Sequence, residues 1–169
     1  MSPRRRAIQS TSGGDTLSTS LAAASKLPRV AITMGDPYGI GPEIIVKALT
    51  HKEIWEACQP VIVGTASIVE QASSIVGAEV LCPVVEPETV LELELRRFGV
   101  ISAAAGKAGY AYIEKAVSLA LAGDVDAVAT APIHKEALNQ AGYAFAGHTE
   151  ILAALTNTPS VSMMLVHGR

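Results

Sequence analysis

Short runs of apolar residues that alternate with helix-like segments constrain the fold of this sequence more than any other feature. The runs occupy residues 29–34 (RVAITM), 60–64 (PVIVG), 78–85 (AEVLCPVV), 125–132 (VDAVATAP) and 160–166 (SVSMMLV). Strands that are apolar along most of their length are typical of parallel sheets, which are buried on both faces. Most of the intervening segments carry apolar residues at helical spacing. The sequence therefore predicts an α/β fold, a mostly parallel sheet with helices on both faces.

Glycine and proline mark the ends of the expected helices. Pro42 suits the first position of the helix that follows the first strand, and Gly77 and Gly123 are expected to end two later helices. Thr149 is the expected N-cap of the last helix. The charged stretch over residues 86–100 shows no regular spacing of apolar residues and is expected to be connecting structure.

Length, charge and cysteine content exclude several classes of protein. The 169 residues suit one ordinary domain. The net charge is −3 and no basic face is visible, so nucleic acid is not an expected partner. No apolar run approaches the roughly 18 residues that span a membrane. Cys58 and Cys82 have no CxxC spacing and fit the reduced thiols of an intracellular protein.

Residues 1–28 differ in composition from the rest. They are rich in Arg, Ser and Ala and contain one acidic residue, Asp15. This composition fits an organelle transit peptide, a disordered leader, or a start codon placed too far upstream. We therefore expect residues 1–28 to be a leader or disordered segment and residues 29–169 to form the folded part.

The first candidate site is the glycine-rich loop between the first strand and the first helix. Gly35, Gly39 and Gly41 there can bring backbone N–H groups toward a phosphate or carboxylate, or they can serve only as a tight turn. The spacing matches neither a dinucleotide fingerprint nor a P-loop. Asp36 is a candidate for a substrate contact, or it closes the turn through its own side chain.

A second group of candidates follows the run at residues 125–132. Thr130, His134 and Lys135 lie near the expected carboxyl end of a strand, where open α/β sheets bind ligands. A lysine can hold an anion there and a histidine can donate a hydrogen bond or carry a proton. The alternative is an ordinary solvated helix start.

The third candidate is His148 within the motif GHTE. Gly147 allows close approach of a ligand to the backbone, and the positive end of a helix favours the neutral imidazole. Glu150 is expected in the first helical turn. The four histidines have no regular ligand spacing, so no metal ligands are assigned, and no nucleophile arrangement identifies a catalytic residue.

Four ordered motifs resemble one known family. ITMGDPYGIGPEI, AVATAPIHKEALNQAG, GHTE and VSMML are similar to the N-terminal half of the 4-hydroxythreonine-4-phosphate dehydrogenase family, from about Val30 to the last residue. A sister branch oxidises D-threonate or D-erythronate 4-phosphate, and PIHKEAL leans toward it. The resemblance implies a cytoplasmic homodimer with an isocitrate/isopropylmalate-dehydrogenase-like fold.

The resemblance also implies an activity. The family oxidises a 4-phosphorylated hydroxy acid with NAD or NADP and a divalent metal (Zn, Mg, Mn or Co), and the oxo acid then loses CO2. The family's substrate-contacting histidine and threonine carry over to His148 and Thr149. Its metal-binding histidines lie in motifs that follow the end of this chain, so no metal ligand carries over. Tyr38 stands where the family commonly has a small residue, and its ring is expected to narrow the pocket or to point outward.

The last expectations concern the length of the chain. The resemblance covers one half of the family, which predicts a truncated, catalytically silent and poorly soluble dehydrogenase fragment. The alternative from another class is a non-catalytic phosphate-binding module.

Overall fold

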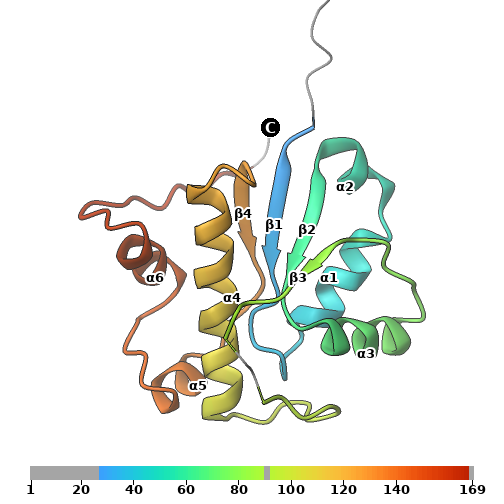
Figure 1. Ribbon diagram of the computed structural model, residues 1–169, viewed down its shortest axis with the longest axis horizontal. Helices are drawn as coiled ribbons and strands as arrows, with labels where there is room; N and C mark the ends of the chain where they lie inside the picture. The colour runs from blue at the N-terminus through green and yellow to red at the C-terminus, as the bar shows by residue number, and fades with distance from the viewer. Residues whose placement is uncertain (1–26, 90–91, 168–169) are drawn as a thin grey trace, which may run out of the picture.

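The first apolar run forms the central strand of a four-stranded sheet (Figure 1). The computed structural model describes residues 27–89 and 92–167. All pairings in the sheet are parallel. In spatial order the strands are β3 (Val84–Val85), β2 (Gln59–Val63), β1 (Arg29–Thr33) and β4 (Ala127–Thr130). The predicted parallel sheet is confirmed, because β1, β2 and β4 fall within the apolar runs or begin one residue before them.

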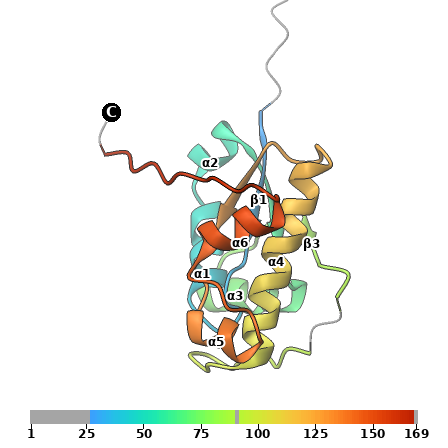
Figure 2. The same ribbon diagram turned by 90° about the vertical axis from the view of Figure 1, so that its left-hand side faces the viewer.

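Helices cover both faces of the sheet, as predicted. The long helix α4 (Ala103–Leu121) lies on one side of β1, and α1 (Gly41–Leu49) lies on the other (Figure 2). On the side of α1 the chain also forms α2 (Lys52–Ala57), which the sequence did not lead us to expect, and α3 (Ala66–Val76). The short helices α5 (Lys135–Gln140) and α6 (His148–Leu155) pack against α4.

Two apolar clusters hold these layers together. The larger joins the sheet to α1, α3 and α4 and includes the fully buried Met34, Ile62 and Tyr112. The smaller joins α4 to the two short helices through Ile113, Leu138 and Ile151. This second cluster holds α6 against α4, and α6 carries the histidine of the GHTE motif.

Most predicted helix ends are confirmed, with small shifts. Gly77 adopts the left-handed conformation just after α3, and Gly123 does so shortly after α4. Pro42 is the second residue of α1, one position later than predicted. Residues 86–100 form no helix or strand in their described part, as expected.

Two predicted strands were wrong in whole or in part. The run at residues 78–85 pairs with β2 only through Val84 and Val85. Residues 160–166 form no strand, and their side chains are exposed. Figure 2 shows this segment running away from the sheet. A run of strand-forming residues becomes a strand only when it pairs with a neighbour, and this segment pairs with no described strand.

The described residues leave some expectations untested. The leader predicted for residues 1–28 lies outside them up to residue 26, as do the last two residues of the chain. No helix in the described ranges is both long and apolar enough to cross a lipid bilayer.

Candidate functional site

The winding of the sheet reverses between β1 and β4. From β1 the chain crosses to β2 through α1 on one face, and from β3 it crosses to β4 through α4 on the other face. Open α/β sheets bind ligands at the carboxyl ends of the strands where the winding reverses. At this edge residues 34–40 follow β1, and residues 131–134 follow β4. Of the candidate residues, Asp36 lies in the first of these loops and His134 in the second, and Lys135 follows directly at the start of α5.

Gly35 brings these two loops into direct contact. Its φ is 72°, and a β-carbon there would overlap the carbonyl oxygen of Pro132 and lie 2.8 Å from that of Ala131. The N–H of Asp36 donates to the same Pro132 oxygen at 2.9 Å. Backbone therefore fills the space beside Gly35, which supports the tight-turn interpretation of this glycine.

Asp36 closes the turn that follows. Its side chain is buried, and Oδ1 accepts a hydrogen bond from the N–H of Tyr38 at 2.9 Å. The carbonyl of Asp36 accepts from Gly39 at 3.1 Å. This is the Asx-type turn that the sequence analysis offered as an alternative. The substrate contact of Asp36 stays a prediction.

The ring of Tyr38 does not point outward, so that expectation was wrong, and the narrowing of a pocket stays a prediction. The residue is only 5% exposed. Its phenol oxygen accepts from the N–H of Glu94 at 3.0 Å. The ring fits because residues 93–99 pass close to the loop and bury it.

His134 and Lys135 lie at the start of α5, directly after the β4 loop. His134 is the N-cap residue, and its Nδ1 accepts from the N–H of Ala137 at 3.4 Å. Lys135 is the exposed first residue of the helix, and Thr130 is exposed at the end of β4. His134 thus has a capping role that was not predicted, and the ligand contacts of His134 and Lys135 stay predictions.

His148 is the first residue of α6 and lies beside the loop after β4. The ring is half-buried, and its Nε2 is buried with no hydrogen-bond partner among the described residues. Burial lowers the pKa of the imidazole, and the nearby backbone of Ala131 partly opposes this shift. This direction favours the neutral ring, and burial, not the helix dipole, is its leading cause. Buried polar atoms normally have a partner, so the bare Nε2 suits a ligand contact.

The expected N-cap of this helix was wrong. Gly147 holds the cap position, and Thr149 is the half-buried second residue of α6. The helix starts earlier because the N–H of Ile151 already donates to the carbonyl of Gly147, at 3.3 Å. Glu150 lies in the first turn, as expected.

Sequence reasoning missed Thr33. This last residue of β1 is fully buried, and its Oγ1 has no hydrogen-bond partner in the described part of the chain. Its carbonyl accepts from the N–H of Ala131 at 3.0 Å, which places Thr33 beside the same loop as His148. A hydroxyl within an otherwise apolar strand was the signal that pointed to it.

Other parts of the surface do not add to this site. A hollow of about 560 Å³ lies between α1 and α2 and contains none of the candidate residues. It lies away from the carboxyl edge of the sheet, where the candidate residues are. Within residues 27–89 and 92–167, no three His, Cys, Asp or Glu side chains are grouped so that they could hold a metal ion. These residues therefore do not fit the metal centre that the resemblance implies.

The fold and the site define a doubly wound α/β protein with a candidate ligand site where the winding reverses. The family model described as pyridoxal phosphate biosynthetic protein PdxA matches residues 56–169. D-threonate 4-phosphate dehydrogenase of Cupriavidus necator is 44% identical in an alignment of 154 residues, and the match covers 83% of this chain and 46% of that protein. The chain belongs to the PdxA family.

Solved structures agree with this assignment. A 4-hydroxythreonine-4-phosphate dehydrogenase structure from Burkholderia phymatum is 41% identical, with a TM-score of 0.77 over 83% of this chain and 47% of that one. One from Klebsiella pneumoniae is 37% identical, with a TM-score of 0.63 over 78% of this chain and 45% of that one. The chain thus spans about half the length of the relatives that it matches.

Proposed function

We propose that this chain binds the phosphorylated hydroxy acid that a PdxA-type dehydrogenase oxidises, at the carboxyl edge of β1 and β4. D-threonate 4-phosphate is the substrate to test first, because the Cupriavidus necator relative carries that name. 4-Hydroxythreonine 4-phosphate is the second, since the two matching structures are described as dehydrogenases of that compound. Both ligands offer a phosphate, a hydroxyl and a carboxylate.

The observation that carries this proposal is the bare Nε2 of His148. The atom is buried beside the loop after β4 and has no partner among the described residues. A neutral imidazole can donate to, or accept from, a substrate hydroxyl, and it can donate to an anionic oxygen. Thr149 adds a hydroxyl one residue further along α6. His134 and Lys135 are proposed as weaker contacts to the anionic end.

The oxidation itself requires more than these residues. It would also need a hydride acceptor, NAD or NADP, and a divalent metal to supply Lewis-acid chemistry. The described residues supply no metal cluster, so we assign them substrate binding and leave the catalytic residues unassigned. We propose that the active protein is a cytoplasmic homodimer, as the family resemblance implies.

Binding can be measured without turnover. Calorimetric titration of the chain with D-threonate 4-phosphate, with 4-hydroxythreonine 4-phosphate and with inorganic phosphate tests the proposal. We expect a hydroxy acid phosphate to bind more tightly than phosphate alone. His148→Ala should weaken this binding about 10- to 100-fold, as expected for a hydrogen bond to a charged group. Thr149→Val should weaken it less.

His51→Ala is the matched control. His51 is exposed before α2, far from the loops after β1 and β4. This variant should bind like the wild type. Equal affinity for phosphate and for both substrates would favour a simple phosphate-binding module. Unchanged affinity in His148→Ala would remove the basis of the proposal. A parallel assay of NAD and NADP reduction with each candidate metal tests the dehydrogenase activity.

A further inference from the structure

Tyr38 is the residue at which two segments of the chain, far apart in sequence, are joined. It belongs to the loop after β1, and it is buried there by residues 93–99.

Three hydrogen bonds fix Tyr38. Its N–H donates to Oδ1 of Asp36 at 2.9 Å, which ties it to the turn. Its carbonyl accepts from the N–H of Gly99 at 2.7 Å, and its phenol oxygen accepts from the N–H of Glu94 at 3.0 Å. The two ends of the segment Glu94–Gly99 are thus held by one residue of the loop.

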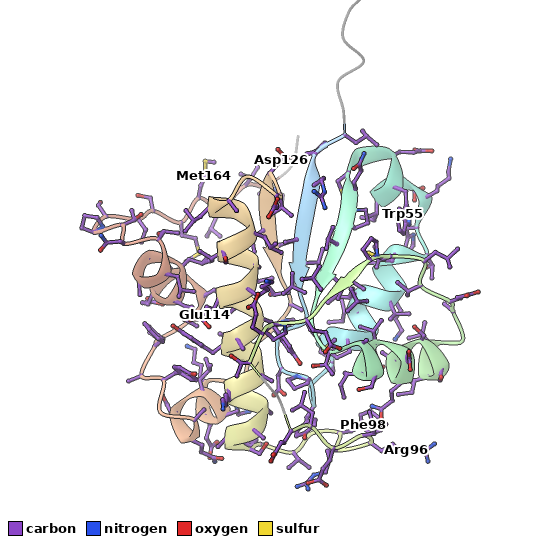
Figure 3. All side chains as sticks on the ribbon, in the orientation of Figure 1. Trp55, Arg96, Phe98, Glu114, Asp126 and Met164 are labelled. Atoms are coloured by element: carbon purple, nitrogen blue, oxygen red, sulfur yellow. The ribbon has the colours of Figure 1, made fainter. Side chains whose placement is uncertain are left out.

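The segment Glu94–Gly99 is held in shape by its own contacts as well. Arg96 has a φ of 62°, which is uncommon for a residue with a side chain, and its N–H donates to Oε1 of Gln71 on α3 at 2.6 Å. Arg97 forms a two-pronged ion pair with Glu94 at 2.8 and 2.9 Å. Figure 3 shows Arg96 and Phe98 at the end of the molecule toward which the strands run. This is the end that carries the candidate site.

The loop that Tyr38 anchors is part of that site. Asp36 donates its N–H to Pro132, so the loop after β1 also touches the loop after β4. The hydrogen bonds therefore run without a break from the segment Glu94–Gly99, through Tyr38 and Asp36, to the β4 loop beside His148. Tyr38 makes the hydrogen bonds that join the segment to the loop, so a change in the order of the segment should reach the site through this residue.

We propose that Tyr38 is a positioning residue of the substrate site, which holds the loop after β1 in place by fastening it to the segment Glu94–Gly99. The role in substrate binding rests on the function proposed above. The connection between the two segments does not, because it is visible in the hydrogen bonds of Tyr38. The two parts can be tested separately.

Tyr38→Phe removes one oxygen and keeps the ring. Amide hydrogen exchange followed by mass spectrometry should then show faster exchange in peptides that cover residues 93–99. Amide exchange in the loop at residues 35–40 should become faster by a similar factor. We expect about threefold to tenfold, the range for the loss of one neutral hydrogen bond. The affinity for D-threonate 4-phosphate should fall by the same order. Tyr143→Phe is the matched control, because Tyr143 stacks on Tyr110 in the smaller apolar cluster.

Each outcome decides one part of the proposal. Faster exchange at residues 93–99 alone, with residues 35–40 unchanged, would show that the phenol holds only its own segment and would overturn the coupling. Faster exchange in both, with unchanged substrate affinity, would overturn the positioning role. If the wild type binds no substrate, the function proposed above fails, and the exchange result alone decides whether Tyr38 couples the segments.

Discussion

Gly35 and Gly77 are two glycines with the same backbone conformation and different surroundings. Both have a φ of 72°. A β-carbon at Gly35 would overlap the β4 loop, whereas nothing lies within 4 Å of one at Gly77. The pair can therefore separate the penalty of the left-handed backbone from the penalty of close packing.

We predict that Gly77→Ala lowers the free energy of unfolding by about 1 kcal/mol, the usual penalty for a side chain in the left-handed region. Gly35→Ala should lower it by a further 2–3 kcal/mol or so, because the loop after β4 must move to admit the methyl group. Urea denaturation of the two variants and the wild type measures both values. Equal losses would mean that the contact of Gly35 with Pro132 does not constrain the site.

The buried imidazole of His148 should make the stability of the fold depend on pH. Burial lowers its pKa in the folded protein below the ordinary value of 6.5. As the pH falls through 6.5, the unfolded chain takes up a proton that the folded protein does not yet bind. The stability should therefore fall in the window from 6.5 down to the lowered pKa. Above that window the ring is neutral in both states and contributes nothing to the pH dependence.

Urea denaturation at about pH 7.5 and about pH 5.5 compares stability above and below the upper end of this window. We expect His148→Gln to lose less stability than the wild type between the two conditions. His51→Gln, which alters an exposed ring, is the control. A loss in His148→Gln as large as in the wild type would show that the ring is not desolvated in the folded state.

At the scale of elements, α5 provides a test of its cap. We predict that His134→Ala destabilises the protein by about 0.5–1 kcal/mol, at the low end for a cap because the Nδ1 to N distance is long at 3.4 Å. Asn is also a good N-cap, so His134→Asn should recover most of the loss. Thermal denaturation compares the two. If both variants bind substrate equally weakly, the ring of His134 contacts the ligand as well.

Local signals predicted most of the elements correctly. The apolar spacing and the terminal glycine of α3 both lie within one short stretch of sequence, and both predictions were confirmed. The sheet order followed less directly, since alternation of strands and helices predicts parallel pairing but does not say which strands are neighbours. The strand predicted at residues 160–166 failed for the same reason, because its apolar residues reveal nothing about a partner.

The site shows the same division between local and distant causes. The position of His148 at a helix start was predictable from GHTE. The burial that lowers the pKa of its ring was not predictable, because it arises from the fold and not from the motif. The ring of Tyr38 was misjudged because Glu94 approaches it across 56 positions of sequence. Only the fold brings such groups together.

At the scale of the whole molecule, exposed apolar surface predicts self-association. Met163 is 74% exposed and Leu165 is 89% exposed. In the described part of the chain β4 pairs with β1 alone, so its other edge is open to further hydrogen bonding. An extended apolar segment and an open strand edge on one molecule favour contacts between copies. We expect particles larger than a monomer by light scattering at micromolar concentration.

The double variant Met163→Lys with Leu165→Lys should shift the size toward the monomer, since two charges oppose burial of the segment. Ser67→Lys, on the exposed side of α3, adds charge without touching that segment and serves as the control. A monomeric wild type would contradict the prediction. A reduction of equal size by Ser67→Lys would mean that net charge, not the segment, controls association.

The position of β1 in the middle of the sheet has a consequence for the order in which the protein is made. Among the described strands β1 is the first to leave the ribosome, yet Arg29 at its start bonds to Asp126, 97 residues later. At a synthesis rate of about 5–20 residues per second, one edge of β1 waits roughly 5–20 seconds for β4. During that time the nascent chain carries a bare strand edge that can pair wrongly. The candidate site needs α6 as well, so it is among the last features of the described chain to exist.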